Sequence, residues 1–484
     1  MISFVLGLVL LVVGFFTYGK LVEKVFGADP SRRTAALTKT DGVDFLPMPA
    51  WKLFMIQFLN IAGLGPIFGA IMGAKFGAAA YLWIVFGTII AGATHDFVAG
   101  MISLREDGIN LPEIIGKYLG KYAHFFMRVL SLVLMVMVGA VFVSGPAGLL
   151  AKLTQGHLDI TFWICVIFAY YMTATLLPID KVIGKIYPVF AIALLFMAFG
   201  VMGALLWHHP QLPEVFDGLA STHPASDSMP IFPIMFVSIA CGAISGFHAT
   251  QSPMMARCMK NERLGRPIFY GAMVAEGIVA LIWAAAANYY YSQNGMGENN
   301  AAIIVDHITR EWLGPVGCVL AMLGVIAAPI TTGDTALRSA RLIAADFLHV
   351  SQRSIMGRMA IAVPIFVCSI GVLVYSIQDS KGFDVIWRYF SWVNQLLSCF
   401  TLWACSAFFA LRAANGNGHR YDCLFTLLPA LFMTMVSLCY ICIAPEGFKL
   451  SPALSYTLGG IFTILLAVWF GLWFQHINKY PKLS

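Results

Sequence analysis

The sequence predicts an all-α membrane protein of about thirteen transmembrane helices, from three observations. Of its 484 residues, 59% are hydrophobic and only 11% are charged, and the mean hydropathy is +0.80. Soluble domains carry roughly 25% charged residues, so these charges are too few to cover a water-exposed surface. The apolar residues fall in runs of roughly 20, the helix length that crosses a hydrocarbon core. Lys and Arg gather in alternate connections between the runs.

The apolar runs define the order of the expected helices. The first run has no basic residue before it, and Lys20 and Lys24 follow it, which is typical of a retained helix rather than a cleaved signal peptide. The connections are short, and none is long enough to form a separate soluble domain. The expected spans are 2–19, 51–73, 77–104, 122–149, 160–178, 186–207, 231–255, 267–290, 313–335, 357–377, 384–411, 421–443 and 453–476.

The positions of Lys and Arg predict the orientation in a bacterial inner membrane. Basic residues favour the cytoplasmic side, and most of the 30 Lys and Arg share one side if the N-terminus is outside and the C-terminus is cytoplasmic. The net charge of +6 therefore follows from membrane topology and does not indicate nucleic-acid binding. The basic residues expected outside are Lys75, Lys152, Arg310, Lys381, Arg388 and Lys449.

Two of the expected spans contain glycine-rich interruptions, NIAGLGP over 60–66 and ACGAISGFH over 240–248. Proline removes a backbone donor and disfavours helix just before it, and glycine permits an unwound backbone. In hydrocarbon, such breaks are tolerated only where they line a cavity or are buried in protein. The alternative is that these glycines merely allow close helix packing. The residues expected to bind substrate are Asn60, Gly63, Gly65, Pro66, Gly242, Ser245, Gly246, His248, Gln251 and Asn394.

The two interruptions lie five helices apart, and their spans start on opposite sides of the membrane. This arrangement predicts a five-plus-five inverted repeat, and broken helices at matching positions of two halves indicate the binding site of a transporter. The expected units are a peripheral helix and cytoplasmic loop, two five-helix repeats, and two peripheral helices with a tail. Their limits are 1–50, 51–207, 231–411 and 421–484.

Few ionisable side chains lie within the expected spans, and each costs at least about 2.5–3.5 kcal/mol at the bilayer centre. Asp96, Glu276 and Asp334 are therefore candidates to carry a coupling proton, and a structural hydrogen bond is the alternative for each. Asp334 precedes Arg338 at i+4 spacing, which favours an ion pair near a helix end. His95 and Asp96 leave their helix about 100° apart and are not expected to share one partner.

Five stretches, taken together and in this order, resemble the carbon starvation protein A (CstA) family of bacterial transporters. They are IAGLGPIFGAIMGAKFG (61–77), AGATHDFVAGMIS (91–103), FVSIACGAISGFHA (236–249), FYGAMVAEGIVA (269–280) and SWVNQLL (391–397). The resemblance implies import of pyruvate or short peptides by proton symport in the carbon-starvation response. It also implies a LeuT-like fold with the five-plus-five repeat.

In LeuT-like folds, hydroxyls of the eighth core helix can bind Na⁺ beside the first broken helix, so the resemblance makes Thr331 and Thr332 candidate ligands. Hydroxyls in membrane helices more often bond to their own backbone, so H⁺ is the expected coupling ion. The alternative is a Na⁺-coupled importer of amino acids or peptides. The chain departs from the family at TQSPMM (250–255) and TTGDT (331–335), near the expected site, which leaves the substrate open.

Other function classes are less favoured. A channel would need a repeated polar face along a pore, and no single helix shows one. An intramembrane enzyme is not expected, because HExxH, GxSxG and paired catalytic Asp motifs are absent. The scattered Cys show neither a CxxC motif nor a Cys/His spacing typical of metal sites. We expect no cofactor, and the expected partners are a small-molecule substrate and the lipid bilayer.

Overall fold

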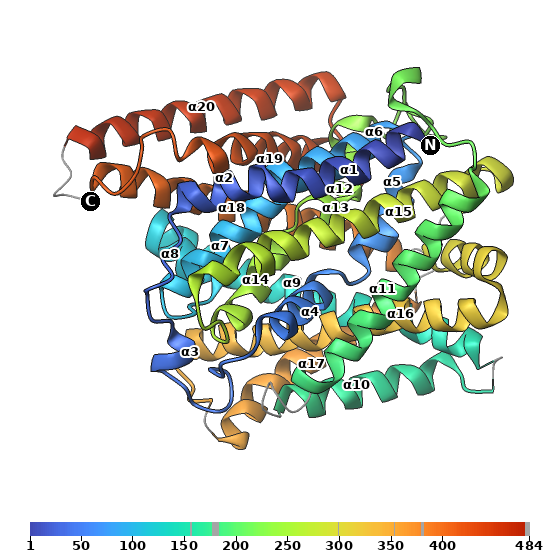
Figure 1. Ribbon diagram of the computed structural model, residues 1–484, viewed down its shortest axis with the longest axis horizontal. Coiled ribbons are helices and arrows are strands. Elements are labelled where there is room, and N and C mark those ends of the chain that lie inside the picture. Colours follow the sequence, from blue (N-terminus) through green and yellow to red (C-terminus); the bar gives the residue numbers. More distant parts are fainter. Residues whose placement is uncertain (155–156, 177–182, 299, 353, 379–381, 480–484) are drawn as a thin grey trace.

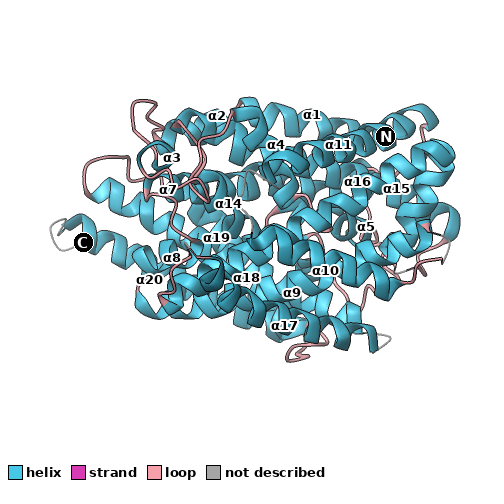
Figure 2. Ribbon diagram, turned by 90° about the horizontal axis from the view of Figure 1, so that it is seen from below, coloured by secondary structure: helices cyan, strands magenta, loops and turns pink. Residues whose placement is uncertain are grey.

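The computed structural model shows long helices running between two ends, where most connections gather (Figures 1 and 2). It describes all residues except 155–156, 177–182, 299, 353, 379–381 and 480–484. Every regular element in the described ranges is a helix. The N-terminus and the end of the last helix lie at opposite ends of the molecule (Figure 1). The predicted end of the fifth span at 178 and the tail from 480 lie outside the described residues.

The first half of the chain forms the elements up to the middle of the sequence. Their bounds are α1 (Ile2–Phe16), α2 (Tyr18–Phe26), α3 (Ala35–Thr38), α4 (Ala50–Ile61), η1 (Gly65–Gly69), α5 (Ala70–Ala74), α6 (Ala79–Leu82), η2 (Trp83–Gly92), α7 (Ala93–Arg105), α8 (Leu111–Leu119), α9 (Lys121–Leu153), α10 (Ile160–Leu176) and α11 (Ile183–His208).

The second half repeats the pattern of a broken helix followed by long helices. Its elements are η3 (Val215–Asp217), η4 (Ile231–Met235), α12 (Phe236–Ser238), α13 (Ala240–Ala243), α14 (Gly246–Ala256), η5 (Glu262–Leu264), η6 (Arg266–Tyr270), α15 (Gly271–Asn294), α16 (Ala301–Leu348), α17 (Ile355–Gln378), α18 (Gly382–Ala414), α19 (Leu424–Ile443) and α20 (Pro452–Lys479).

Ten helices of the described residues are long and apolar enough to cross a membrane. Helix α4 and the η1–α5 segment meet at a bend of 54° and make an eleventh span together. The two remaining predicted spans correspond to α10, which has 17 residues, and to the interrupted stretch from η4 to α14. Each predicted span therefore has a helical counterpart, although one of them is short and two are broken.

Two spans extend further than the sequence predicts. The first continues through α2 to Phe26, where Gly27 ends it with a left-handed φ of 69° that favours glycine. The ninth, expected to end near 335, continues in α16 to Leu348. Arg338 and Arg341 consequently lie inside this helix and are fully buried, not at its solvated end.

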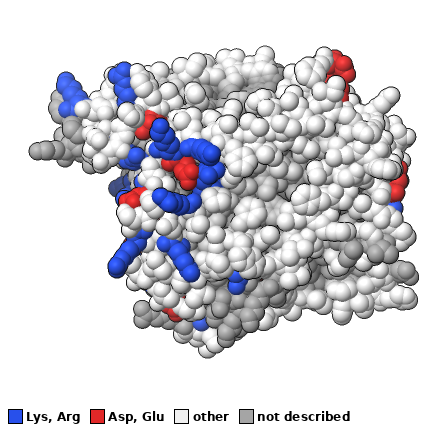
Figure 3. All heavy atoms as spheres, in the orientation of Figure 1, with Lys and Arg blue, Asp and Glu red and all other residues white. Residues whose placement is uncertain are grey.

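Lys and Arg side chains gather at the end of the molecule where α2 ends and α3 and α8 lie, which we call the basic end (Figure 3). The connection between α3 and α4 folds over the bundle at this end. The Met48 N–H donates to the Cys258 carbonyl at 3.1 Å, and the Arg257 guanidinium lies 5.3 Å from the centre of the Phe45 ring. This connection covers the region of the bundle beneath the two breaks.

Candidate functional site

The first break separates α4 from η1. Helix α4 ends at Ile61, and Ala62 leaves helical geometry with φ −80° and ψ 52°. A Cβ atom on Gly63 would lie 2.8 Å from Phe142 and 2.9 Å from the Thr332 hydroxyl, so this glycine allows a close approach. That hydroxyl donates to the Leu59 carbonyl at 2.9 Å. Helix α16 therefore contacts the chain just before the first break.

The second break is an extended step between α13 and α14. Ile244 and Ser245 adopt extended geometry, with φ of −158° and −147°. Asn394 of α18 accepts at Oδ1 from the Phe247 N–H at 2.7 Å and from the Ser245 hydroxyl at 3.0 Å. Gln395, next in the sequence, donates to the Ile244 carbonyl at 3.0 Å. These amides replace hydrogen bonds that a continuous helix would have made within itself.

Thr88 of η2 completes the support of the second break. Its hydroxyl donates to the Gly242 carbonyl at 3.2 Å. A Cβ on Gly242 would lie 2.7 Å from that of Ala280, and one on Gly246 would lie 2.6 Å from the Asn394 carbonyl. Close packing, the alternative reading of these glycines, is thus a real part of their role.

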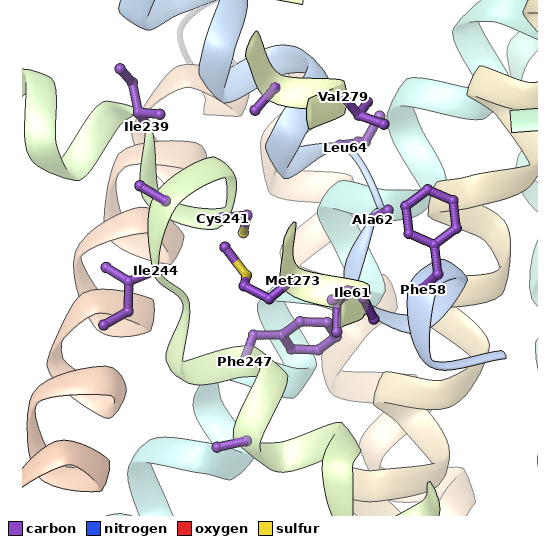
Figure 4. Packing of buried hydrophobic residues seen from close by; sticks show 14 of the residues in the cluster. Phe58, Ile61, Ala62, Leu64, Ile239, Cys241, Ile244, Phe247, Met273 and Val279 are labelled. Carbon is purple, nitrogen blue, oxygen red and sulfur yellow. The ribbon is translucent and has the colours of Figure 1, made fainter. Parts of the chain in front are cut away.

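The two breaks meet in the interior of the molecule. In Figure 4 the unwound stretch from Ile61 to Leu64 faces the stretch from Ile239 to Phe247. Gly65, next to Pro66, packs directly against the Cys241 side chain, which a Cβ at Gly65 would overlap. The predicted substrate region therefore joins the two halves of the molecule at a glycine-to-cysteine contact.

Four ionisable side chains form a buried relay beside the second break, which we call the His–Asp–His–Glu relay. His95 Nδ1 lies 2.7 Å from Asp96 Oδ1, and His248 Nδ1 lies 2.9 Å from Asp96 Oδ2. His248 Nε2 lies 3.3 Å from Glu276 Oε2. All four side chains are 0% exposed. The relay crosses from α7 through α14 to α15 and therefore links both halves.

The sequence indicated each acid of this relay but not their connection. The sequence predicts that His95 and Asp96 do not share one partner, and in the structure the His95 ring contacts the Asp96 carboxylate itself. Side-chain torsions allow this contact although the two Cα–Cβ bonds diverge. His248 lies in the first turn of α14, directly after the extended step, and from there contacts Asp96 of α7 and Glu276 of α15. No sequence spacing could have revealed this, since the three elements are distant in the chain.

Several buried polar atoms near the breaks have no hydrogen-bond partner. Both oxygens of Glu276 are among them, as are the two amide atoms of Asn60 and of Gln57. His95 and His248 each leave Nε2 without a hydrogen bond. Buried polar groups are nearly always satisfied, so such a set indicates where water, a proton or a ligand binds. Gln57 is not among the residues that the sequence predicts for the site, because it is a lone polar residue in an apolar run.

Asp334 lies apart from the relay. Tyr187 of α11 donates to its Oδ2 at 2.8 Å, whereas its Oδ1 has no hydrogen-bond partner. Arg338 Nη1 lies 3.8 Å from Asp44 Oδ1 and its Nη2 donates to the Ala174 carbonyl at 2.5 Å, so it interacts with the α3–α4 connection and with α10. Tyr187 is in an apolar run and gave no sequence signal.

Two further predicted residues have protein partners. Gln251 donates to the Thr250 hydroxyl at 2.9 Å and accepts from Ser339 at 3.3 Å, so it faces α16 and not the breaks. Thr331 donates to the Ala328 carbonyl of its own helix at 2.7 Å. Within the described residues, no group of three or more His, Cys, Asp or Glu could hold a metal ion.

A cavity of about 480 Å³ opens on the side of the first break away from the basic end. Phe68 of η1 and Trp387 of α18 line it together with Lys152 and Glu298. Lys152 supplies a positive charge near the mouth. The relay side chains and Asn60 are fully buried and do not line this cavity. A second cavity, of about 460 Å³, lies at the basic end, where Arg32, Arg105 and Arg412 line it.

Most of the chain is similar to known sequences. A family model described as carbon starvation protein CstA matches residues 1–218, 157–311 and 296–440. An uncharacterized membrane protein of Haemophilus influenzae is 41% identical over 60% of this chain and 91% of its own length. The pyruvate/proton symporter BtsT of Escherichia coli is 26% identical over 64% of this chain and 54% of its own. The peptide transporter CstA of Campylobacter jejuni is 29% identical over 56% and 47%. The match thus spans about half the length of these last two relatives.

Solved structures support the fold. A manganese transporter of Eremococcus coleocola superposes with a TM-score of 0.60 at 13% identity and covers 91% of this chain and 99% of its own. MhsT in complex with L-phenylalanine gives 0.58 at 15% identity, with coverage of 82% and 99%. Both have the LeuT-like fold, so the predicted fold class is confirmed. At these identities the likeness concerns the fold alone.

Proposed function

Because this chain belongs to the carbon starvation protein CstA family, we propose that it is a proton-coupled importer of a small carboxylate. Pyruvate is the first candidate substrate and short peptides are the second, by analogy with the named relatives. The observation that carries the proposal is the His–Asp–His–Glu relay. It joins the two halves of a transporter fold directly at a broken helix.

The relay offers a physical route from proton binding to helix movement. Asp96 accepts from two histidines, and His248 stands between two carboxylates. A proton that arrives at Glu276 or leaves His248 changes the attraction between α14 and α15. In a buried, low-dielectric region such a change in charge is worth far more than at a surface. The start of α14, where Ser245 and Gly246 follow the extended step, would respond first.

The first break supplies polar groups that can bind the proposed substrate. Asn60 has both amide atoms unpaired and stands just before the unwound step, so it can bind a carboxylate or an amide of the substrate. The cavity bearing Lys152 would admit an anion from the opposite side. With the basic end in the cytoplasm and the N-terminus outside, this cavity faces outward. Single cysteines at Ser221 and Asn415 should label from outside and inside respectively, and equal accessibility would overturn this orientation.

Coupling is tested by comparing accumulation with exchange in liposomes. Asp96→Asn and Glu276→Gln each remove a charge that the relay needs to move a proton. Both variants should lose most accumulation of labelled pyruvate or dipeptide under a pH gradient, and keep exchange, because exchange needs no net proton movement. Asp334→Asn is the matched control, since Asp334 contacts Tyr187 and not the relay. Loss of both activities in parallel would assign the relay a structural role.

Sodium coupling is the second candidate, favoured by one contact. The Thr332 hydroxyl lies 2.9 Å from both the Leu59 and the Ala328 carbonyls, so oxygen atoms of α16 and of the first break converge. Na⁺ binds such oxygen sets, although here the hydroxyl already donates to backbone. Uptake driven by a Na⁺ gradient at equal pH on both sides would support this candidate and contradict proton symport.

A further inference from the structure

Arg341 of α16 is a fully buried arginine with half of its hydrogen-bonding capacity unused. Its Nη1 donates to Gln352 Oε1 at 2.5 Å, whereas Nε and Nη2 have no hydrogen-bond partner. These two groups form one edge of the guanidinium, the edge that binds a carboxylate through two parallel hydrogen bonds. A buried charge without a partner is costly, so an open edge of this kind points to a ligand.

The charges around Arg341 also favour an anion. Arg338 lies one turn away on the same helix, and Arg358 of α17 and Arg257, after α14, act on it from other elements. Among the described residues, Asp44 of the α3–α4 connection is the anion that acts on it, and its Oδ1 lies 3.8 Å from Arg338. Cations on three elements thus surround Arg341, with one carboxylate against them.

Arg341 lies on α16, between the first break and the basic end. It follows Thr332, which contacts the first break, by nine residues on one helix. At about 1.5 Å per residue, it stands roughly 14 Å further toward the basic end. Gln352 accepts a hydrogen bond from it there, and Asp44 of the α3–α4 connection lies 3.8 Å from the neighbouring Arg338. The Arg341 guanidinium therefore lies between the first break and the basic end along α16.

We propose that the open edge of Arg341 is a second binding site, which takes the carboxylate of the transported solute on its way to the basic end. The identity of the solute rests on the proposed function. The preference for a carboxylate rests on the guanidinium edge alone. The second site lowers the barrier for an anion to cross the covered region, and it satisfies the buried charge of Arg341 while the solute is bound.

Acetate is a suitable probe because it contains little besides the carboxylate. The midpoint of thermal unfolding of the purified protein is measured against acetate and against chloride at constant ionic strength. Acetate should raise the midpoint more than chloride does. Arg341→Lys keeps the charge but loses the edge, and should need roughly tenfold more acetate for the same rise. Arg310→Gln, an exposed arginine earlier on α16, is the control and should match the wild type.

Three outcomes decide the proposal. An acetate effect that survives in Arg341→Lys, or equal effects of acetate and chloride on the wild type, would overturn it. If Arg341→Lys does not fold, hydrogen exchange of the wild type decides instead. Acetate should then protect the segment 335–352 and chloride should not, and equal protection would overturn the site. Failure of pyruvate and peptide uptake would refute the proposed function separately, because the acetate measurements need no transport.

Discussion

The two broken helices differ in how their unwound backbone is satisfied. At the second break, Asn394, Gln395 and Thr88 supply hydrogen bonds to the backbone on both sides of the extended step. At the first break, Thr332 contacts one carbonyl, and the nearby amides of Asn60 and Gln57 stay unpaired. One break is thus held by protein side chains, whereas the other keeps polar groups free for a ligand.

This difference suggests that the two breaks have different roles. The second break is preorganised, and it positions His248 between Asp96 and Glu276 with little freedom. The first break faces the cavity through Phe68 and offers unsatisfied donors and acceptors. In this arrangement the second break would hold the proton relay in place and the first break would bind the substrate. Each of the three predictions below can contradict this assignment of roles to the two breaks.

The largest effect is expected from adding a methyl group at the second break. In Gly246→Ala the new Cβ meets the Asn394 carbonyl and the Ser398 backbone nitrogen, which cannot rotate away. Overpacking of this kind costs about 1–3 kcal/mol or more, so little folded protein should be recovered. In Gly63→Ala the neighbours are the side chains of Phe142 and Thr332, which can shift. That variant should fold and lose transport. The yield of folded protein on size-exclusion chromatography and the uptake of labelled substrate distinguish the two variants. A higher folded yield for Gly246→Ala than for Gly63→Ala would contradict the proposed difference between the breaks.

A smaller effect is expected from removing one amide at each break. Asn394→Ala leaves the Phe247 N–H and the Ser245 hydroxyl without their acceptor, which should cost about 1–3 kcal/mol per buried group. Asn60→Ala removes an amide without hydrogen bonds, so the unfolding midpoint should stay within a degree or two while uptake falls. Thermal unfolding and uptake of the same preparations test this. Equal destabilisation by both variants would show that Asn60 is structural.

The smallest effect is expected from removing, at each break, a threonine hydroxyl that donates to a backbone carbonyl. Thr88→Val removes a bond of 3.2 Å to the Gly242 carbonyl and should cost about 1 kcal/mol with unchanged ion dependence. Thr332→Val removes the bond to Leu59 and should cost about the same if H⁺ is the coupling ion. A loss of Na⁺-dependent uptake in Thr332→Val alone would instead reveal a cation site. Uptake in Na⁺ and in choline buffers makes the distinction.

Predictions from sequence succeeded where a residue type acts through its local pattern. The apolar runs, the glycine breaks and the rarity of buried charge were all visible because membrane depth penalises every exception. Asn394 and Ser245 were recognised as polar residues near a break, but they were expected to bind substrate. In the structure they bond to each other and to the backbone. Asp334 was grouped with the acids of the relay, from which Tyr187 and α11 separate it.

What the sequence by itself determined is the membrane class, the order of the spans, the two breaks and the few acids at bilayer depth. Each follows from a local cost, since hydrocarbon accepts neither free backbone groups nor unneeded charges. Only the tertiary structure decided which of these groups meet. His248 follows the extended step at Ile244 and Ser245, and at the start of α14 it contacts Asp96 of α7 and Glu276 of α15. Contacts between elements so distant in the chain depend on the packing of whole helices, which no local pattern encodes.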